Sequence, residues 1–314
     1  GIADVHLPLI RELLANHAPG ARVQLDALRL PLLRQLPAKK RTMFKNRHYF
    51  RSFDAIVTPE RTSLFMRRLG LGRTRLIWTR HGAGDRAIGF AQDVDQFDYV
   101  LMAGRKIEER LLAAQLIRPG HYSSGVYAKF DWLRKRPPSL RLFDNDRPAV
   151  LYNPHFDPKL SSWPAFGAEI LEYFARSERY NLIFAPHVRL FDPPSKARYR
   201  PFERYMGLSH MHIDLGSVRS IDMSYIGAAD LYLGDVSSQV AEFLCRPRPC
   251  LFLNAHGAAW QNNPDYQSWT LGPVIDRVDQ LTDALEQAFA GHPGFVAEQW
   301  RYVAETFEVP ADGS

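Results

Sequence analysis

Four short segments carry residues that could do chemistry, and each follows an apolar run of strand length. They are residues 79–85 (TRHGAGD), 153–156 (NPHF), 185–189 (APHVR) and 234–242 (GDVSSQVAE). In open parallel sheets, ligands bind beyond the carboxyl ends of the strands. A binding or catalytic site is therefore expected where these four segments begin.

The first segment places an imidazole between small and charged residues. His81 could act as a base, because an imidazole titrates near neutral pH. Gly82 and Gly84 would let a substrate approach the backbone closely, with Arg80 and Asp85 on either side. The alternative, a histidine that only satisfies the structure, stays open.

The second and third segments combine sharp turns with polar side chains. Asn153 follows one apolar run, and His187 with Arg189 follows another, so both segments could face phosphate. His81 and His187 stand at matching strand ends in the two halves of the chain, as residues lining an interdomain cleft would.

The fourth segment has the form of a strand, a turn with hydroxyl groups, and a helix start. Asp235, Ser237 and Ser238 precede the helix, whose free N–H groups and dipole would favour an anion such as a diphosphate. An ordinary helix cap would use the same residues.

The elements that position these segments alternate in the manner of an α/β protein. With 314 residues, 46% of them hydrophobic and 24% charged, the chain is expected to be globular with about two domains. We place the boundary in the proline-rich, charged stretch 133–148, which gives domains 1–140 and 141–314. The expected strands are 54–58, 75–78, 99–102, 149–152, 181–185, 212–214, 231–233 and 250–253. The expected helices are 105–115, 163–177, 222–228, 238–243, 279–290 and 294–308, the last two bracing both domains.

Charge and cysteine content indicate which partners and which cellular compartment to expect. The formal net charge is +6, which favours anionic partners. Residues 39–51 interleave cations with aromatics and could lie on an anionic membrane or grip a polyanion; a solvated helix face is the alternative. Two cysteines, Cys245 and Cys250, suit a reducing compartment and a buried structural position. We expect a cytoplasmic protein without a signal peptide or membrane span.

Several other signals are weak or missing. The sequence has no Gly-rich dinucleotide fingerprint, Walker loop or nucleophile elbow, which lowers the rank of oxidoreductases, NTPases and serine hydrolases. His210 and His212 have strand spacing with both rings on one face, but we see no carboxylate or cysteine cluster near them, so no metal site is predicted. The chain begins without methionine and runs into an amphipathic segment at 7–14, which leaves open whether a first strand precedes it.

Taken in order, these motifs resemble those of the CDP-glycerol glycerophosphotransferases, the teichoic-acid-type polymerases and primases. The matching positions are Arg80-His81-Gly82, Tyr152-Asn153-Pro154, Pro186-His187, and the block from Ala229-Asp230 through Gly234-Asp235-Val236-Ser237-Ser238 to Glu242-Phe243. The sequence departs from the family at Val236, where tyrosine is usual, and at Glu242, where aspartate is usual.

The resemblance implies a GT-B architecture, an α/β fold of two Rossmann-like parallel-sheet domains facing a cleft. It implies a transferase that moves glycerol phosphate from CDP-glycerol, or a sugar from a nucleotide sugar, to a hydroxyl of a cell-surface polymer or a lipid-linked acceptor. His81 and His187 would be catalytic. Asn153, Arg189, Asp235, Ser237, Ser238 and Glu242 would bind the donor, Glu242 through its ribose hydroxyls. Residues 80, 82, 84 and 85 would form the acceptor loop.

This reading needs no metal and no cofactor beyond the activated donor, and no nucleic acid partner is expected. The protein would act in cell-envelope biogenesis, such as teichoic acid or capsule synthesis, at the inner face of the plasma membrane. Two alternatives stay open: a nucleotide-sugar glycosyltransferase or 2-epimerase of the same fold, and a non-catalytic polyanion binder acting through residues 39–51.

Overall fold

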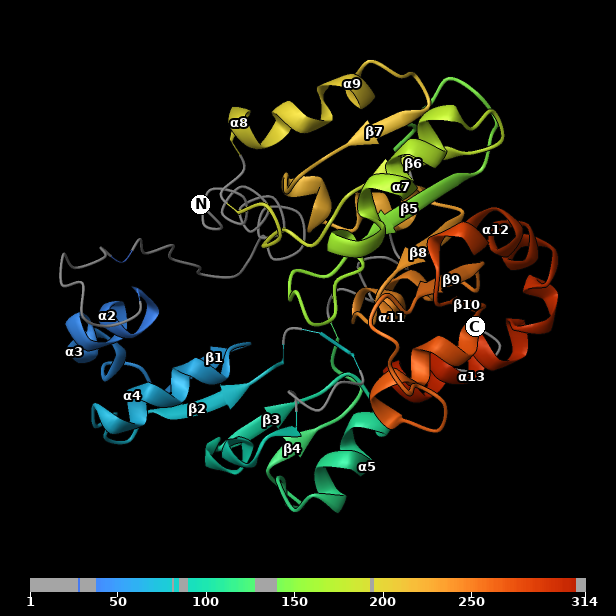
Figure 1. The fold of residues 1–314 in the computed structure, drawn as a ribbon. Helices are drawn as coiled ribbons and strands as arrows, with labels where there is room; N and C mark the ends of the chain where they lie inside the picture. Colours follow the sequence, from blue (N-terminus) through green and yellow to red (C-terminus); the bar gives the residue numbers. More distant parts are fainter. Residues whose placement is uncertain are drawn as a thin grey trace. The chain divides into compact units, whose positions relative to one another are not determined.

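The computed structural model describes residues 28, 38–80, 82–84, 90–127, 140–192 and 195–308. Two compact units emerge within these ranges, and Figure 1 shows their elements. The first contains the described residues up to 127 together with 304–308, and the second contains those from 140 to 303. The amphipathic segment expected at 7–14, and the candidate site residues His81 and Asp85, lie outside the described residues.

The first unit is built on a parallel sheet of four strands in the order β1-β2-β3-β4. These are β1 (Ala55–Thr58), β2 (Arg75–Trp78), β3 (Tyr99–Leu101) and β4 (Tyr122–Ser123). Its helices are α2 (Ala38–Lys45), α3 (Arg47–Phe50), α4 (Phe65–Arg68) and α5 (Arg105–Ala113), with 3-10 turns η1 (Arg61–Leu64) and η3 (Gln92–Gln96).

Burial alternates along the strands of this unit. Leu76 and Trp78 in β2 are buried, and Trp78 stacks on Phe97 with ring centroids 5.5 Å apart. Ala55 and Val57 in the edge strand β1 are exposed. The last turn of α13 (Val296–Phe307) belongs to the same unit.

The second unit contains a parallel sheet of six strands in the order β10-β9-β8-β5-β6-β7. The strands are β5 (Ala149–Asn153), β6 (Asn181–Phe184), β7 (Met211–Ile213), β8 (Leu231–Gly234), β9 (Cys250–Leu253) and β10 (Val274–Ile275). Every residue of the four central strands is buried, as is typical of a parallel sheet with helices on both faces. The chain builds outward from β5 to β6 and β7, then returns to place β8, β9 and β10 on the other side. This is the doubly wound order of a Rossmann-type sheet.

Helices and 3-10 turns connect these strands, and η7, α12, η8 and α13 follow the last of them (Figure 1). They are α7 (Trp163–Arg176), α8 (Lys196–Tyr199), η4 (Arg200–Phe202), α9 (Glu203–Met206), η5 (Val218–Ser220), α10 (Ser224–Ala228), α11 (Gln239–Phe243), η6 (Pro264–Leu271), η7 (Val278–Gln280), α12 (Leu281–Ala290), η8 (His292–Gly294) and α13. None of the helices in the described ranges is both long and apolar enough to cross a bilayer.

Aromatic packing holds α7 and the α8–α9 segment onto the sheet. The ring of Phe184, at the end of β6, has no exposed surface and lies 5.1 Å from the Trp163 ring and 5.5 Å from the Phe202 ring, centroid to centroid. Burying an aromatic side chain of this size contributes about 3 kcal/mol or more. The end of β6 is therefore a rigid platform for the loop that follows it.

The α/β class and the predicted strand positions are confirmed, with β2 and β9 matching residue for residue. The predicted structural roles of Cys245 and Cys250 are also confirmed, since both are buried, one after α11 and one at the start of β9. The sequence patterns did not predict α4, the α8–α9 segment, β4 or β10, and a helix over residues 39–51, where α2 and α3 lie, was only the alternative interpretation. The two strands have two residues each, too few to show an alternating pattern.

Candidate functional site

The order in which the chain adds strands to the sheet of the second unit reverses between β5 and β8. These two parallel strands are neighbours, and Asn153 pairs with Gly234. Such a reversal leaves a crevice at the carboxyl ends of the strands, where ligands bind in this class of sheet. The two loops that leave this point begin at Pro154 and Asp235. Both belong to segments that the sequence marked as candidate sites.

Asp235, at the start of the loop after β8, is hydrogen-bonded to the loop after β5. Its side chain is fully buried, and its Oδ2 accepts hydrogen bonds from the backbone N–H groups of His155 (2.7 Å) and Ser162 (3.0 Å). Its Oδ1 is buried with no hydrogen-bond partner among the described residues. Burial raises the pKa of Asp235 to about 7, although the two amide hydrogen bonds act in the opposite direction. In this position Asp235 acts by holding the loop after β5; the predicted contact with a donor stays a prediction.

Gly234 and Asn153 allow β5 to lie close to β8 and to the loop after β6. A Cβ atom on Gly234 would stand 2.9 Å from the Asn153 carbonyl oxygen, so a side chain there would push the strands apart. The Asn153 amide donates to the carbonyl of Ala185 at 2.6 Å, and Asn153 is buried. The side chain thus joins β5 to the loop after β6, and its predicted role in phosphate binding is untested.

Two Pro-His dipeptides leave the sheet in register. Tyr152 pairs with Phe184 at the ends of β5 and β6, and three residues on, His155 lies beside His187. The His187 N–H donates to the Pro154 carbonyl at 3.0 Å, which extends the ladder by one step, and the two imidazole rings are 5.7 Å apart between centroids.

Both imidazoles are held in the same tautomer. The backbone N–H of Asp157 donates to Nδ1 of His155 at 3.0 Å, and that of Arg189 donates to Nδ1 of His187 at 3.2 Å. A neutral imidazole that accepts at Nδ1 carries its proton at Nε2, where it is a hydrogen-bond donor. The pair therefore presents two donors of one kind from adjacent strands.

Phe156 and Arg189 complete the cluster. The Phe156 ring lies 4.6 Å from each of the rings of His155 and His187, and the Arg189 guanidinium lies over it at 4.0 Å from the centroid. Arg189 is exposed and His187 is half-buried. We call His155, Phe156, His187 and Arg189 the imidazole cluster. Imidazole N–H groups and a guanidinium are groups that bind phosphate.

The serines of the fourth segment lie on the neighbouring loop, and the helix after them is shorter than the anion-site argument requires. Ser237 Oγ accepts from the Gln239 N–H at 3.2 Å, which is an ordinary capping contact, while Ser238 makes no capping bond. The helix α11 has five residues, so few peptide dipoles add up at its start. Glu242, in the first turn of α11, is buried at 1% exposure. Its predicted contact with ribose is untested.

In the first unit, the loop after β2 begins in a strained conformation. Arg80 has a φ of 53°, a left-handed value that is uncommon for residues other than glycine. Its guanidinium lies over the rings of Trp78 (5.3 Å) and Phe90 (4.8 Å) and is largely buried. Four other non-glycine residues among those described also have positive φ, so the role of this loop stays a prediction. Gly82 and Gly84 belong to the described part of the loop, and Arg80 donates to the Gly84 carbonyl at 3.5 Å.

His210 and His212, for which no metal site was predicted, make separate hydrogen-bonding contacts. His210 precedes β7 and contacts the Phe174 carbonyl, whereas His212 contacts the Tyr225 hydroxyl at 2.8 Å. That hydroxyl donates to Asp214 at 2.6 Å. Hydrogen bonds to Asp214 outweigh the opposing effect of burial and lower its pKa, while burial lowers the pKa of His212. Within the described ranges, no cluster of three or more acidic, histidine or cysteine side chains could hold a metal ion.

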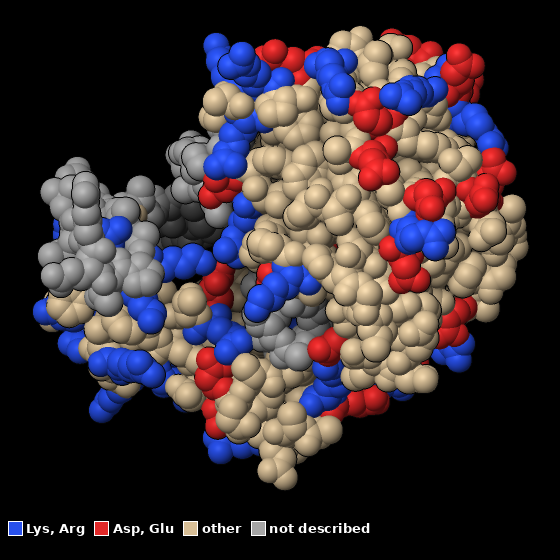
Figure 2. All heavy atoms as spheres, viewed as in Figure 1, with Lys and Arg blue, Asp and Glu red and all other residues tan. Residues whose placement is uncertain are grey.

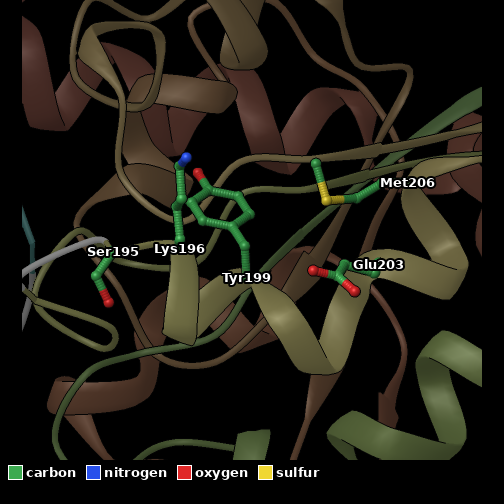
Figure 3. Close-up of a pocket in the computed structure, with 5 residues that line it drawn as sticks. All are labelled: Ser195, Lys196, Tyr199, Glu203 and Met206. Carbon is green, nitrogen blue, oxygen red and sulfur yellow. The ribbon is translucent and has the colours of Figure 1, made fainter.

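A surface hollow of about 400 Å³ lies over α8 and α9 (Figure 3). The five residues that line it are Ser195, Lys196, Tyr199, Glu203 and Met206. In Figure 3 the Lys196 side chain runs alongside the Tyr199 ring. Four of the five are exposed, and none belongs to the candidate site segments. We assign this hollow no part in the site.

His155 was not among the predicted site residues, although the loop that contains it was a predicted site segment. A usable signal was present, since Pro154-His155 and Pro186-His187 repeat one dipeptide after two apolar runs. That repeat gains meaning only when the two strands are known to be neighbours.

The comparisons with known proteins bear on the fold. No family model matches the sequence, and no curated protein matches it. A solved structure of the wall teichoic acid polymerase TagF superposes with a TM-score of 0.61 at 13% identity, over 96% of this chain and 81% of that chain. The chain has the GT-B fold.

Two further structures support the same conclusion. TagF determined with CDPG gives a TM-score of 0.59 at 13% identity, covering 96% of this chain and 79% of that one. A putative UDP-N-acetylglucosamine 2-epimerase from Listeria monocytogenes gives a TM-score of 0.52 at 10% identity, covering 82% and 74%. The GT-B fold class expected from the sequence is thereby confirmed. At these identities the likeness establishes the fold and leaves the reaction to be proposed.

Proposed function

We propose that this protein is a GT-B transferase that binds a nucleoside diphosphate donor at the imidazole cluster. The observation that carries the proposal is the in-register pair His155 and His187, with Arg189 beside them, at the carboxyl end of the second-unit sheet. A diphosphate needs several donors that converge from fixed positions. Backbone hydrogen bonds to both Nδ1 atoms and the buried Asp235 supply that fixation.

The donor we favour is CDP-glycerol. The order of motifs along the sequence resembles that of the glycerophosphotransferases, and a TagF structure with the same fold was determined with CDPG. In this reaction an acceptor hydroxyl oxygen attacks the glycerol-bearing phosphorus. A new P–O bond forms, the bond to the CMP oxygen breaks, and CMP leaves with that electron pair.

We give the imidazole cluster and His81 separate roles in this reaction. The imidazole cluster stabilises the negative charge that develops on the leaving phosphate, which is the main requirement of phosphoryl transfer. His81 takes the proton of the acceptor hydroxyl as general base. The acceptor is a hydroxyl of a surface polymer or of a lipid-linked precursor.

The first test is a thermal-shift screen with CDP-glycerol, CMP, CDP, UDP and UDP-sugars. A ligand present at 100 times its dissociation constant stabilises the folded state by about 2.7 kcal/mol. We expect stabilisation by the cytidine compounds, and its loss in His155→Ala and His187→Ala. His121→Ala is the matched control, because His121 is an exposed histidine of the first unit. Stabilisation that persists in both cluster variants would refute the proposed site.

A second candidate is a nucleotide-sugar enzyme of the same fold, favoured by the likeness to the putative 2-epimerase. Selective stabilisation by UDP or a UDP-sugar would move the proposal there. An epimerase converts its substrate without an acceptor, whereas a transferase needs one, so product analysis with and without an acceptor separates the two. No response to any nucleotide would favour the polyanion binder.

A further inference from the structure

Asp214 is a buried carboxylate to which the proposed reaction gives no role. Acidic and basic side chains are interspersed over the face of the second unit that Figure 2 shows. Asp214, directly after β7, is instead only 4% exposed. Its backbone N–H donates to the Phe184 carbonyl at 2.9 Å, so the pairing of β6 with β7 continues to this point. An ionised carboxylate in such a place is costly unless hydrogen bonds satisfy its oxygens.

Among the described residues, five donors converge on this carboxylate. Oδ1 accepts from the backbone N–H groups of Gly216 (3.0 Å) and Ser217 (2.8 Å). Oδ2 accepts from the hydroxyls of Ser217, Ser220 (3.3 Å) and Tyr225 (2.6 Å). The Tyr225 hydroxyl is in turn 2.8 Å from Nε2 of His212. Since most of these donors belong to the loop after β7, the carboxylate fixes the conformation of that loop.

The loop after β7 lies against the turn that carries two members of the imidazole cluster. Gly216 has a φ of 134°, a backbone conformation that favours glycine. A Cβ atom there would stand 3.6 Å from the Val188 carbonyl oxygen, in ordinary van der Waals contact. Val188 stands between His187 and Arg189. Their turn is closed by a hydrogen bond of 2.8 Å from the Leu190 N–H to the His187 carbonyl. The loop therefore packs against the turn at its middle.

We propose that Asp214 is a positioning residue of the donor site, which holds the loop after β7 against the turn of His187 and Arg189. This inference rests on the proposed donor binding at the imidazole cluster, and it adds a residue that acts without contacting the donor. Groups that converge on a diphosphate must stand in fixed positions. A displacement of about 1 Å can cost about a hundredfold in rate, even when its cause lies far from the chemistry.

The charge state of Asp214 follows from its surroundings. Burial acts to raise its pKa, but the hydrogen bonds outweigh that effect and lower the pKa, so the carboxylate is ionised at neutral pH. The titratable or charged side chains that face this network are His212 of β7, Tyr199 of α8, Arg219 of η5 and Tyr225 of α10. Protonation of the carboxylate would remove acceptors from the loop.

The test is isothermal titration calorimetry of the full chain with CDP and with UDP. For the nucleotide that the wild type binds, Asp214→Asn should raise the dissociation constant about tenfold or more. In a His187→Ala background the same substitution should change it by less than about threefold, because the residue through which Asp214 acts is absent. Asp222→Asn is the matched control and should leave binding unchanged. Asp222 lies in the same connection between β7 and β8 and accepts the Ser224 N–H at 2.9 Å.

A pH profile separates positioning from a general loss of stability. Tyr225→Phe removes one donor to the carboxylate, which raises the pKa of Asp214. On acidification, nucleotide affinity should therefore begin to fall at a higher pH in this variant than in the wild type. The shift should be absent when Asp214→Asn/Tyr225→Phe is compared with Asp214→Asn. Circular dichroism and melting temperature establish that each variant is folded. If Asp214→Asn does not fold, the comparison of Tyr225→Phe with the wild type decides.

Equal nucleotide affinity of the wild type and folded Asp214→Asn would overturn this inference and leave the proposed donor site standing. So would the same loss in the wild-type and His187→Ala backgrounds, or a pH profile of Tyr225→Phe that matches the wild type. Failure of the wild type to bind any nucleotide would instead refute the proposed function, and this inference with it.

Discussion

The two sheets of this protein differ in how completely their strands are buried. All residues of β5, β6, β8 and β9 in the second unit are buried, whereas β1 in the first unit alternates between exposed and half-buried residues. Parallel strands are normally covered on both faces. The second unit meets that rule, and β1 departs from it.

The difference relates to what each unit can offer a ligand. In the second unit, buried polar groups such as Asp235 and Asn153 hold the loops at the carboxyl ends of the strands. Donors that converge on a phosphate need such fixed positions. In the first unit, β1 leaves Ala55 and Val57 exposed, so this strand offers no comparable buried scaffold. The donor site that we propose therefore lies in the second unit.

Substituting one histidine in each unit tests whether donor binding belongs to the second unit. His81→Ala should lower turnover by about 10²- to 10⁴-fold, because a general base contributes that much. Donor binding by titration calorimetry should be unchanged in this variant. His187→Ala should instead weaken donor binding. If His81→Ala abolished donor binding, the assignment of donor binding to the second unit would be wrong.

One substitution in each sheet tests whether side-chain burial contributes differently to stability in the two sheets. Phe184→Ala should destabilise the protein by about 3–5 kcal/mol, because it removes a fully buried ring from an aromatic cluster. Val57→Ala should change stability by less than about 0.5 kcal/mol, because the side chain is 60% exposed. Urea denaturation measures both, and similar losses would remove the distinction between the sheets.

Asp235 makes the stability of the second unit depend on pH. Its pKa is about 7 in the folded protein against an ordinary 3.8. Since the folded pKa is the higher one, its favourable contribution is complete below about pH 4 and is lost as the pH rises to about 7. The loss is at most about 4 kcal/mol.

Asp235→Asn removes this titration. Urea unfolding from pH 4 to 8 should show the wild type losing stability relative to the variant across that range, and no further change above it. A difference between the two proteins that did not vary with pH would contradict the assignment.

Arg248 links the ends of two short helices of the same unit. Its guanidinium donates to the carbonyls of Ile226 (2.9 Å), Ala229 (2.6 Å) and Phe243 (2.5 Å). Desolvation lowers its pKa to about 10. Arg248→Ala should cost about 3 kcal/mol, since charge-assisted hydrogen bonds to buried carbonyls are lost. Arg248→Lys keeps the charge but not the planar fork, so thermal denaturation should show little recovery. Full recovery would mean that charge alone matters.

Much of the fold was predictable because its signals are local. Apolar runs such as Arg75–Trp78 and Cys250–Leu253 have strand length and are bounded by turn residues, so both strands were placed correctly. The helices α2 and α3 were only the alternative interpretation of residues 39–51, because aromatics among cations blur the apolar periodicity there. The loops after β5, β6 and β8 were recognised as candidate sites from their polar residues alone.

The roles within those loops were less predictable, because they depend on which strands are neighbours. The sequence was sufficient to indicate the α/β class, the alternation of elements and the loops that carry polar chemistry, since propensity and periodicity act over a few residues. Placing β5 between β6 and β8 is a long-range outcome of packing. That placement sets His155 beside His187 and buries Asp235 beneath the loop. Burial also depends on which groups surround a side chain in space, so the fold had to be known before Asp235 could be recognised as a positioning residue.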